Sequence, residues 1–340
     1  MGSILFTKNT PYDLRDWQQR QDIIEVYGGH NCIMALCSDG TVLRKCIAEK
    51  QVVNTFNQMR YIQAGSFTSK DAELAGWKNV RQISLSSQYP GLALGITAEG
   101  DCIALLPTAH ICETDLQSII QTISGWHNIA EVSALHDLFA LTREGNVLQW
   151  CFPTRRGGFA SQTIERRRYS RCDSWKDIAH IRGGNLAICG LTRHGSAVLS
   201  YPWDSQLSED RCFFKDVIDA YPTGSEGDLP LIVQNNHTLI SVLSNNCTII
   251  CHEVARLIGC LDSILALTAD ERLLPALWMP NVDEVRAWRG ITSATVGFKD
   301  WNTVDSFVLA VTREQVQVDD FPKEAAVVDD SEIGTIFHKG

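Results

Sequence analysis

The sequence contains no stretch of about 18 consecutive apolar residues, the length that a membrane-spanning helix requires. Its N-terminus lacks the basic segment and apolar run of a secretory signal. We therefore expect no membrane partner and a cytoplasmic location. The phosphate loop and the H-E-x-x-H, G-x-S-x-G and G-x-G-x-x-G motifs are also absent. We expect no cofactor, assign no catalytic residue and predict that the chain is not an enzyme.

The 12 cysteines do not form a metal-binding pattern. Their spacing is irregular and no C-x-x-C occurs, whereas a zinc site normally shows two close pairs of ligands. Cys247 and Cys251 form one close pair, with His252 and Cys260 nearby, so a metal site stays a minor alternative. Thiols inside predicted strands act as small apolar side chains, as at Cys32, Cys102 and Cys189. We expect reduced thiols and no metal.

Charge and composition indicate one soluble globular unit. The apolar fraction of 44% suffices for a sizeable core, and no low-complexity linker divides residues 20–318. The formal net charge of −10 favours solubility and argues against general nucleic-acid binding. We expect a monomer whose partner is a protein.

One short pattern returns along most of the chain. An aromatic residue opens a run of alternating apolar residues, and the clearest openings, at Trp77, Trp126 and Trp175, are 49 residues apart. A fixed period of this size is typical of a solenoid, a propeller or an array. The runs are β-type, as in Ile129-Ala-Glu-Val-Ser, rather than helical in periodicity.

A turn position recurs seven times between the apolar runs. Asp39-Gly40 and Glu144-Gly145 predict two-residue hairpin turns, in which glycine supplies the positive φ. The last three copies lack the glycine, so His237 and Glu271 must adopt the left-handed conformation or form another turn type.

Repeated units of three or four short antiparallel strands predict an all-β, seven-bladed β-propeller. WD-repeat propellers are the nearest alternative, but their signatures do not recur, and Trp203-Asp204 is a single instance. The aromatic residues that open the blades are expected to lie as wedges between blades. They are Trp77, Trp126, Trp175, Phe214 and Trp288.

Two segments resemble the repeat of the regulator of chromosome condensation family. They are Val26-Tyr-Gly-Gly-His30 through Asp39-Gly40, and Trp126-His-Asn-Ile through Trp150. In that family a repeat runs from an apolar strand through Gly-Gly-x-His, a second strand, Asp-Gly and a third strand. The resemblance is degenerate, because Gly183-Gly184 lacks the histidine and the family's closing Gly-Gln-Leu-Gly is absent. It implies a seven-bladed propeller, and it does not carry over nucleotide-exchange activity. His30 is interpreted as a structural residue that bonds a neighbouring blade.

The predicted domains are an N-terminal segment at 1–19, the propeller at 20–318 and an acidic C-terminal tail at 319–340. A propeller opens unless its first and last blades are joined, since strand edges invite mispairing. We expect Ser3–Thr7 to close the ring by adding a strand to the blade that holds Val308–Val311.

A connection at residues 153–175 departs from the acidic background, because it carries six arginines. Arginine offers planar, bidentate pairing with carboxylates, and loops on a rigid scaffold often bind partners. We therefore predict a docking loop for an acidic partner, the alternative being a solvated connection. The candidate partner-binding residues are Arg155, Arg156, Arg166, Arg167, Arg168 and Arg171.

The function expected from the sequence is that of a non-catalytic protein-interaction scaffold. The alternatives are an enzyme with its site at the mouth of the central channel, and a propeller-type inhibitor or ligand-binding protein. Converging carboxylates or histidines in the channel would favour an enzyme, whereas an arginine-rich face would favour a scaffold.

Overall fold

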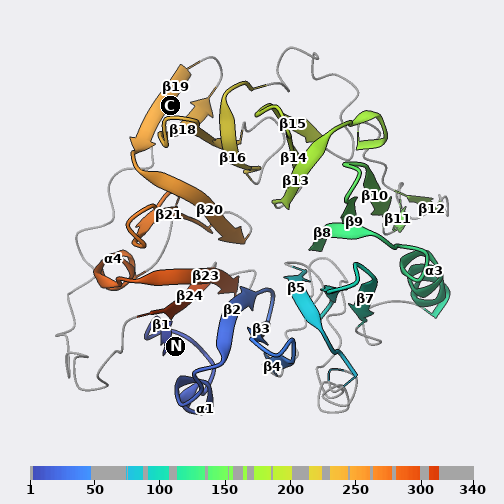
Figure 1. Ribbon diagram of the computed structural model, residues 1–340, viewed down its shortest axis with the longest axis horizontal. Coiled ribbons are helices and arrows are strands. Elements are labelled where there is room, and N and C mark those ends of the chain that lie inside the picture. Colours follow the sequence, from blue (N-terminus) through green and yellow to red (C-terminus); the bar gives the residue numbers. More distant parts are fainter. Residues whose placement is uncertain are drawn as a thin grey trace.

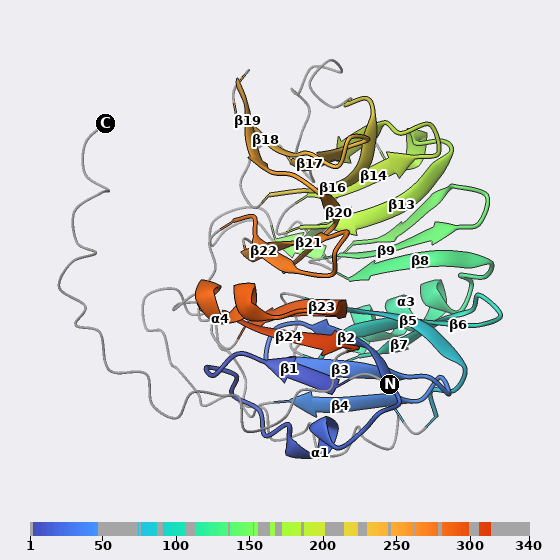
Figure 2. The ribbon, with the colours of Figure 1, turned by 60° about the vertical axis from the view of Figure 1, so that its left-hand side comes forward.

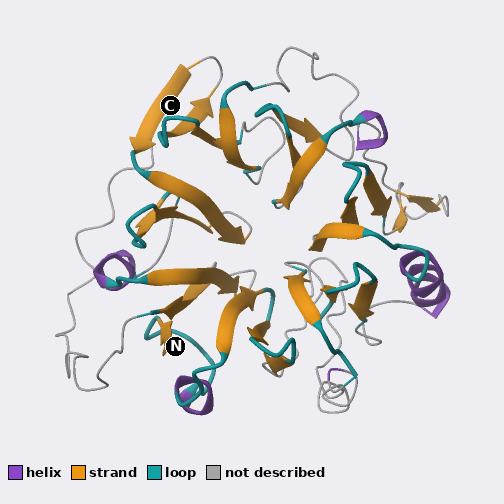
Figure 3. Cartoon of the chain, viewed as in Figure 1, coloured by secondary structure: helices purple, strands orange, loops and turns teal. Residues whose placement is uncertain are grey.

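The computed structural model describes residues 3–46, 74, 76–86, 91–106, 113–134, 137–151, 153–155, 164–166, 172–184, 187–200, 214–223, 230–243, 246–260, 263–277, 281–298 and 306–313. Its small antiparallel sheets are arranged in a ring around a central channel (Figure 1). Helices are few and lie at the rim (Figure 3). The prediction of an all-β propeller is confirmed.

Seven described sheets have three or four strands, and we number them as blades one to seven in chain order. Blades one to four comprise β2 (Ile23–Gly28), β3 (Cys32–Cys37) and β4 (Val42–Cys46); β5 (Val80–Leu85), β6 (Ala93–Thr97) and β7 (Cys102–Leu105); β8 (Ile129–Ala134), β9 (Leu138–Thr142) and β10 (Val147–Trp150); and β13 (Ile178–Gly183), β14 (Ile188–Thr192) and β15 (Ala197–Ser200).

Blades five to seven comprise β16 (Val217–Tyr221), β17 (Leu231–Gln234), β18 (Leu239–Leu243) and β19 (Asn246–Cys251); β20 (Val254–Cys260), β21 (Ser263–Thr268) and β22 (Leu273–Pro275); and β23 (Ile291–Phe298), β24 (Ser306–Thr312) and β1 (Ser3–Phe6). The remaining elements are α1 (Arg15–Gln18), α3 (Glu113–Ile123), α4 (Val282–Ala287), the 3-10 turn η2 (Cys172–Ser174) and the pair β11 (Pro153–Arg155) and β12 (Ile164–Arg166). These sheets agree with seven blades, and the count for the whole chain stays a prediction.

The hairpin turns have a three-residue form rather than the expected two-residue form. Gly145 N donates to Thr142 O at 2.9 Å, and Thr142 N donates to Asn146 O at 2.9 Å. Only the glycine has positive φ, at 90°. This is a type I turn followed by a left-handed bulge residue. His237 (φ 62°) and Glu271 (φ 61°) adopt the same conformation without glycine.

The left-handed turn residue also bonds the next blade. Its carbonyl accepts the N–H of the first residue of the following innermost strand, as in Gly100 O to Ile129 N at 2.9 Å. The same bond links five other pairs, which are Gly40–Val80, Gly145–Ile178, Gly195–Val217, His237–Val254 and Glu271–Ile291. Each of these turns therefore fixes the position of the next blade along the channel axis.

Apolar cores lie between blades rather than inside them. Seven clusters of buried side chains each draw on two successive blades, including the pair formed by blades seven and one. The blade-opening aromatics lie in these clusters, so their prediction as wedges is confirmed. Trp175 lies directly over Gly190, where an added Cβ would come within 2.9 Å of the indole ring.

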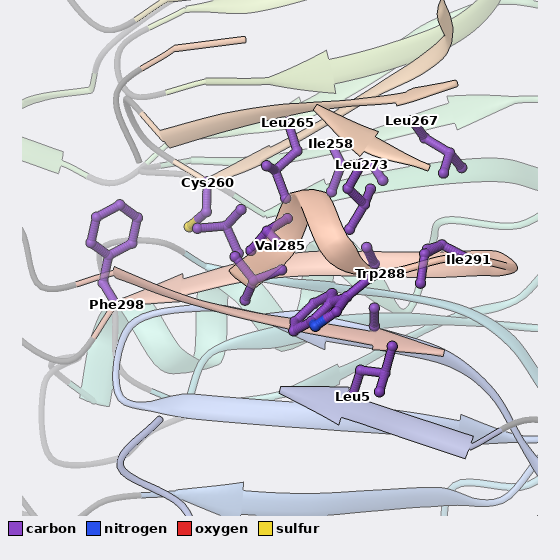
Figure 4. Close-up of a cluster of buried hydrophobic side chains, with 14 residues drawn as sticks. Leu5, Ile258, Cys260, Leu265, Leu267, Leu273, Val285, Trp288, Ile291 and Phe298 are labelled. Carbon is purple, nitrogen blue, oxygen red and sulfur yellow. The ribbon is translucent and has the colours of Figure 1, made fainter. Parts of the chain in front are cut away.

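The ring closes through the N-terminal strand, as predicted. β1 pairs antiparallel with β24, with Ile4 opposite Val311 and Leu5 opposite Ala310. Leu5 points toward Trp288 in the cluster between blades six and seven (Figure 4), and Ile4 packs in the cluster between blades seven and one. Figure 2 shows β1 beside β24, close to blade one. The first residues of the chain therefore belong to its last blade.

Two cysteines depart from the expectation of reduced thiols. Cys32 and Cys46 lie directly opposite each other on β3 and β4 and form a disulfide, with Cα atoms 4.2 Å apart. The sequence did not predict this pair because the 14-residue separation has no recognisable disulfide spacing. Cys102 and Cys189 are buried, free thiols, as expected.

Replacing Ile4 with alanine tests ring closure. Because Ile4 is only 2% exposed and packs between the first and last blades, we expect a loss of about 2–4 kcal/mol of unfolding free energy. Ile24→Ala is the matched control, since Ile24 is 46% exposed, and it should cost under about 1 kcal/mol. Urea unfolding of both variants makes the measurement. Equal losses of unfolding free energy in the two variants would contradict the role of β1 in closing the ring.

Candidate functional site in the central channel

The channel is lined by the innermost strand of each blade, and these strands share one irregularity. In all seven the register shifts by one residue after the first position, as between Ile129 and Glu131. A β-bulge of this kind changes the direction in which the following side chain points. The third residues of the strands all line one cavity of about 660 Å³, and they are Glu25, Gln82, Glu131, His180, Asp219, Arg256 and Ser293.

An innermost strand has an unpaired edge, and side chains of the preceding blade pair with it. Glu131 of β8 accepts the Ile181 N–H of β13 at 2.8 Å, and its other oxygen lies 2.7 Å from His180 Nδ1. One carboxylate thus holds two residues of the next blade. Because a strand edge at the channel would otherwise leave buried backbone donors unpaired, these bonds have a structural role.

Asp219 of β16 has the most partners of the channel residues. Its Oδ2 accepts the Leu257 N–H of blade six at 2.7 Å, while its Oδ1 accepts the Ala220 N–H at 2.9 Å. Arg182 of blade four donates to both oxygens, at 3.0 and 3.3 Å. The Asp219 side chain is 10% exposed and that of Arg182 is 36% exposed. One aspartate therefore joins three consecutive blades.

Hydroxyl groups and arginines make similar links elsewhere in the ring. Ser84 Oγ accepts the Ala134 N–H at 2.9 Å, and Thr295 Oγ1 accepts the Gly28 N–H at 2.7 Å across the closure between blades seven and one. Arginines bond carbonyls of the following blade, as in Arg81 Nη2 to Ile129 O at 2.7 Å and Arg256 Nη2 to Thr292 O at 2.9 Å. Cross-blade hydrogen bonds thus run around most of the channel.

The charges in the channel shift one another's pKa. The hydrogen bond that His180 donates to the Glu131 carboxylate raises the pKa of His180. Desolvation disfavours the charge of Arg182, but attraction to Asp219 and Glu131 outweighs it, so the pKa of Arg182 is raised. Desolvation, followed by repulsion from Arg182, lowers the pKa of Arg256. Glu131 and Asp219 therefore stabilise the charged forms of His180 and Arg182, whereas burial and Arg182 destabilise the charge of Arg256.

The convergence of carboxylates and histidines that would favour an enzyme is present only in part. Three carboxylates and one histidine converge on the channel, as an enzyme would require, but Glu131 and Asp219 are bonded to backbone and to cations. Among the residues that the structure describes, no three His, Cys, Asp or Glu side chains are grouped to hold a metal ion. The arrangement can rigidify the ring and bind a polar group, and it also holds the Tyr27 hydroxyl hydrogen-bonded to the Glu25 carboxylate.

The predicted docking loop contains an antiparallel strand pair rather than a continuous loop. β11 pairs with β12, with Arg155 opposite Ile164 and Arg166 opposite Pro153. Arg155 and Arg166 therefore lie on paired strands within the predicted docking loop, and their role in partner binding stays a prediction. The other four candidates lie outside the described residues, namely Arg156, Arg167, Arg168 and Arg171. β11 and β12 lie at the outer rim, away from the channel (Figure 1).

The sequence did not predict the residues of the channel, although a signal was present. Aligning the repeats on the blade openings places Glu131, His180 and Asp219 at the same third position, and a charged or polar residue stands there in all seven copies. His180 is bonded to Glu131, and its side chain is 60% exposed. His30 is buried, and its N–H bonds Ser86 O of blade two at 3.3 Å, in agreement with a structural role.

No family model and no curated protein matches the sequence. Solved structures do match in shape. Human WBSCR16 has a TM-score of 0.53 at 12% sequence identity, covering 87% of this chain and 88% of that one. The chain has a regulator-of-chromosome-condensation-like propeller fold. Yeast RCC1 (Prp20), solved with Kap60, has a TM-score of 0.45 at 13% identity, covering 85% and 80% of the two chains. Identities this low show the fold alone.

Asp219→Ala tests the cross-blade role of the channel. The substitution leaves the Leu257 N–H unpaired and removes the partner of Arg182, so we expect a loss of about 2–3 kcal/mol in chemical unfolding. The matched control is Asp283→Ala, at an exposed position of α4, with an expected change within about 0.5 kcal/mol. An Asp219 variant as stable as this control would refute the role.

The raised pKa of His180 predicts a pH dependence. The stability from its bond to Glu131 is fully present below the unfolded-state pKa of about 6.5, and it is lost as the pH rises through the higher folded-state pKa. The difference in unfolding free energy between the parent chain and His180→Gln should therefore be larger at pH 5.5 than at pH 8.5. His194→Gln, at an exposed turn position, should show no such difference. A pH-independent effect of His180→Gln would contradict the linkage.

Proposed function

We propose that the chain is a protein-interaction scaffold, whose rigid ring presents the arginine-rich segment (residues 153–171) to an acidic protein surface. The observation that carries the proposal is the paired stem of this segment. β11 and β12 pair in a fixed register, so the described part of the segment is an ordered stem. Binding segments on rigid supports lose less conformational entropy on association.

Charge supports the choice of an acidic partner. The chain carries a formal net charge of −10, so six arginines within one segment are the strongest local departure from its own charge. Complementary charge increases the rate and specificity of association. The fold is compatible with such a role, and a fold by itself does not assign one. A cytoplasmic location is part of the proposal; the buried free thiols of Cys102 and Cys189 support it, and the Cys32–Cys46 disulfide is evidence against it.

An enzyme with its site in the channel is the second candidate. The observation that favours it is the cavity of about 660 Å³ into which His180 and Glu131 project. Their bond to each other and the backbone bond of Glu131 favour a structural role instead. Substitutions can distinguish the two candidates. Replacing arginines of the arginine-rich segment should impair a scaffold, whereas it should not affect an enzyme whose site is in the channel.

Replacing Arg166, Arg167 and Arg168 together with alanine tests the scaffold. We expect capture of acidic proteins from native-host extract to fall by about tenfold or more at an unchanged melting temperature, because charge pairing with the partner is lost. Recovered proteins are quantified by mass spectrometry at low and at high salt. The parent chain should lose capture at high salt more steeply than the variant does.

The matched control removes three lysines elsewhere. Lys78, Lys176 and Lys215 are exposed and precede the innermost strands of three blades. Their triple alanine variant has the same net charge as the arginine variant, so it separates a local effect from a general one. Equal capture by the parent and the arginine variant, or equal losses in both variants, would refute the docking role.

A further inference from the structure

Two charged residues of the channel lack a partner of opposite charge among the described residues. Glu131 and Asp219 each accept a backbone N–H of the next blade and lie against a cation. The side chain of Glu25, on β2, instead accepts only the Tyr27 hydroxyl. Arg256, on β20, donates to one backbone carbonyl of β23 and forms no ion pair within the described part of the chain. The bonds of the fold therefore leave one negative and one positive charge unmatched.

These two charges flank Ser293, which belongs to the blade between them. Arg256 bonds the carbonyl of Thr292, the residue directly before Ser293, at 2.9 Å. Val26, which directly follows Glu25, donates its N–H to Ser293 Oγ at 3.4 Å. β20, β23 and β2 lie side by side around the channel (Figure 1). Serine is the smallest of the seven third-position residues, so the cavity is least filled by a side chain between the two charges.

The charge of Arg256 is costly without an anion beside it. Desolvation, followed by repulsion from Arg182, lowers the pKa of Arg256, and the opposing effect of the Glu25 charge is smaller. An opposite charge in direct contact would stabilise the guanidinium. A guanidinium also pairs with a carboxylate through two parallel hydrogen bonds. Arg256 is therefore suited to hold the carboxylate of a ligand.

The opposite side of the same site offers hydrogen-bond acceptors. Gln82, at the third position of β5 in the blade after that of Glu25, lines the cavity and has a buried side-chain oxygen without a hydrogen-bond partner. Burial raises the pKa of Tyr27, so its hydroxyl stays protonated and donates to one oxygen of Glu25. The other oxygen of Glu25 can accept a second donor. A buried acceptor without a donor costs free energy, which a ligand N–H group would recover.

We propose that this part of the channel binds a free α-amino acid, with its carboxylate on Arg256 and its ammonium group on Glu25 and Gln82. Such a ligand carries both charges on neighbouring atoms, and a primary ammonium has three N–H donors for the two acceptors. The cavity of about 660 Å³ lies within the size range of small-molecule sites. The proposal goes beyond the scaffold function and does not rest on it, since the site includes no residue of the arginine-rich segment.

The charges that line the cavity favour a zwitterion over a simple anion. Glu25, Glu131 and Asp219 all line it, so a dianion such as phosphate would meet three carboxylates. A ligand with one carboxylate and one ammonium group adds no net charge. A quaternary ammonium compound has the same two charges but no N–H donor for Gln82.

Calorimetric titration of the full chain with each standard L-amino acid tests the proposal. We expect at least one amino acid to bind, and to bind about tenfold or more tightly than propionate, ethylamine or glycine betaine, because each of these lacks one charge or the N–H donors. A chain that binds no amino acid at concentrations up to about 10 mM would overturn the proposal. So would a chain that binds propionate as tightly as its best amino acid.

Substitutions locate the bound amino acid. Arg256→Gln and Glu25→Gln should each weaken the best-binding amino acid by about tenfold or more, since each removes one charge-assisted hydrogen bond. Glu25→Gln should also reduce the preference for that amino acid over propionate, an effect that a purely structural role of Glu25 would not produce. Gln82→Met is a second test that does not depend on the folding of the charge variants. Because the Gln82 oxygen has no partner, this change should weaken binding without lowering the free energy of unfolding.

Arg81→Gln is the matched control. Arg81 also lines the cavity and bonds a carbonyl of the following blade, at 2.7 Å, but its side chain reaches from blade two to blade three. Its variant should bind the amino acid like the parent chain. Binding that survives both Arg256→Gln and Gln82→Met, or that Arg81→Gln weakens as much as Arg256→Gln does, would overturn the assigned site.

Discussion

Burial of apolar surface between neighbouring blades is the interaction on which the rest of the structure depends. A three-stranded sheet has two faces and cannot bury both by itself. Each of the seven core clusters draws its side chains from two successive blades, and the last cluster includes both ends of the described chain. Removing one blade would therefore expose apolar surface on two others, so the ring gains its stability as a unit.

Polar bonds add direction to this packing. Apolar contact alone would allow blades to slide, since it has no preferred geometry. The turn carbonyls and the channel side chains fix the positions of the blades relative to one another along the channel axis. Asp219 alone bonds residues of three blades. Most of the charged residues at the channel are consequently explained by what they bond in the fold.

Much of this architecture could be predicted because a sequence pattern that is weak in one copy becomes recognisable when it recurs in several copies. Trp77, Trp126 and Trp175 marked the blade openings, and Ser3–Thr7 could be assigned to the last blade because a ring needs closure. The turn type could not be predicted, since Asp-Gly suits two hairpin geometries. Helix α3 was also missed: Ile119 and Ile123 are buried while Ile120 is exposed, a helical pattern too short to stand out among strands. The channel residues could be aligned from the blade openings, but the bulge that turns them into the channel leaves no signal in the sequence.

The pairing of β1 with β24 has a consequence for biosynthesis. Ile4 meets Val311 only after some 300 further residues have been made, so the first strand leaves the ribosome long before its partner exists. During that interval the nascent chain carries an unmatched β-strand and open apolar faces at both ends of an incomplete ring. Contacts of such long sequence separation form slowly. The circle can therefore close only after the final blade has been synthesised, and until then the apolar faces at its two ends have no partner.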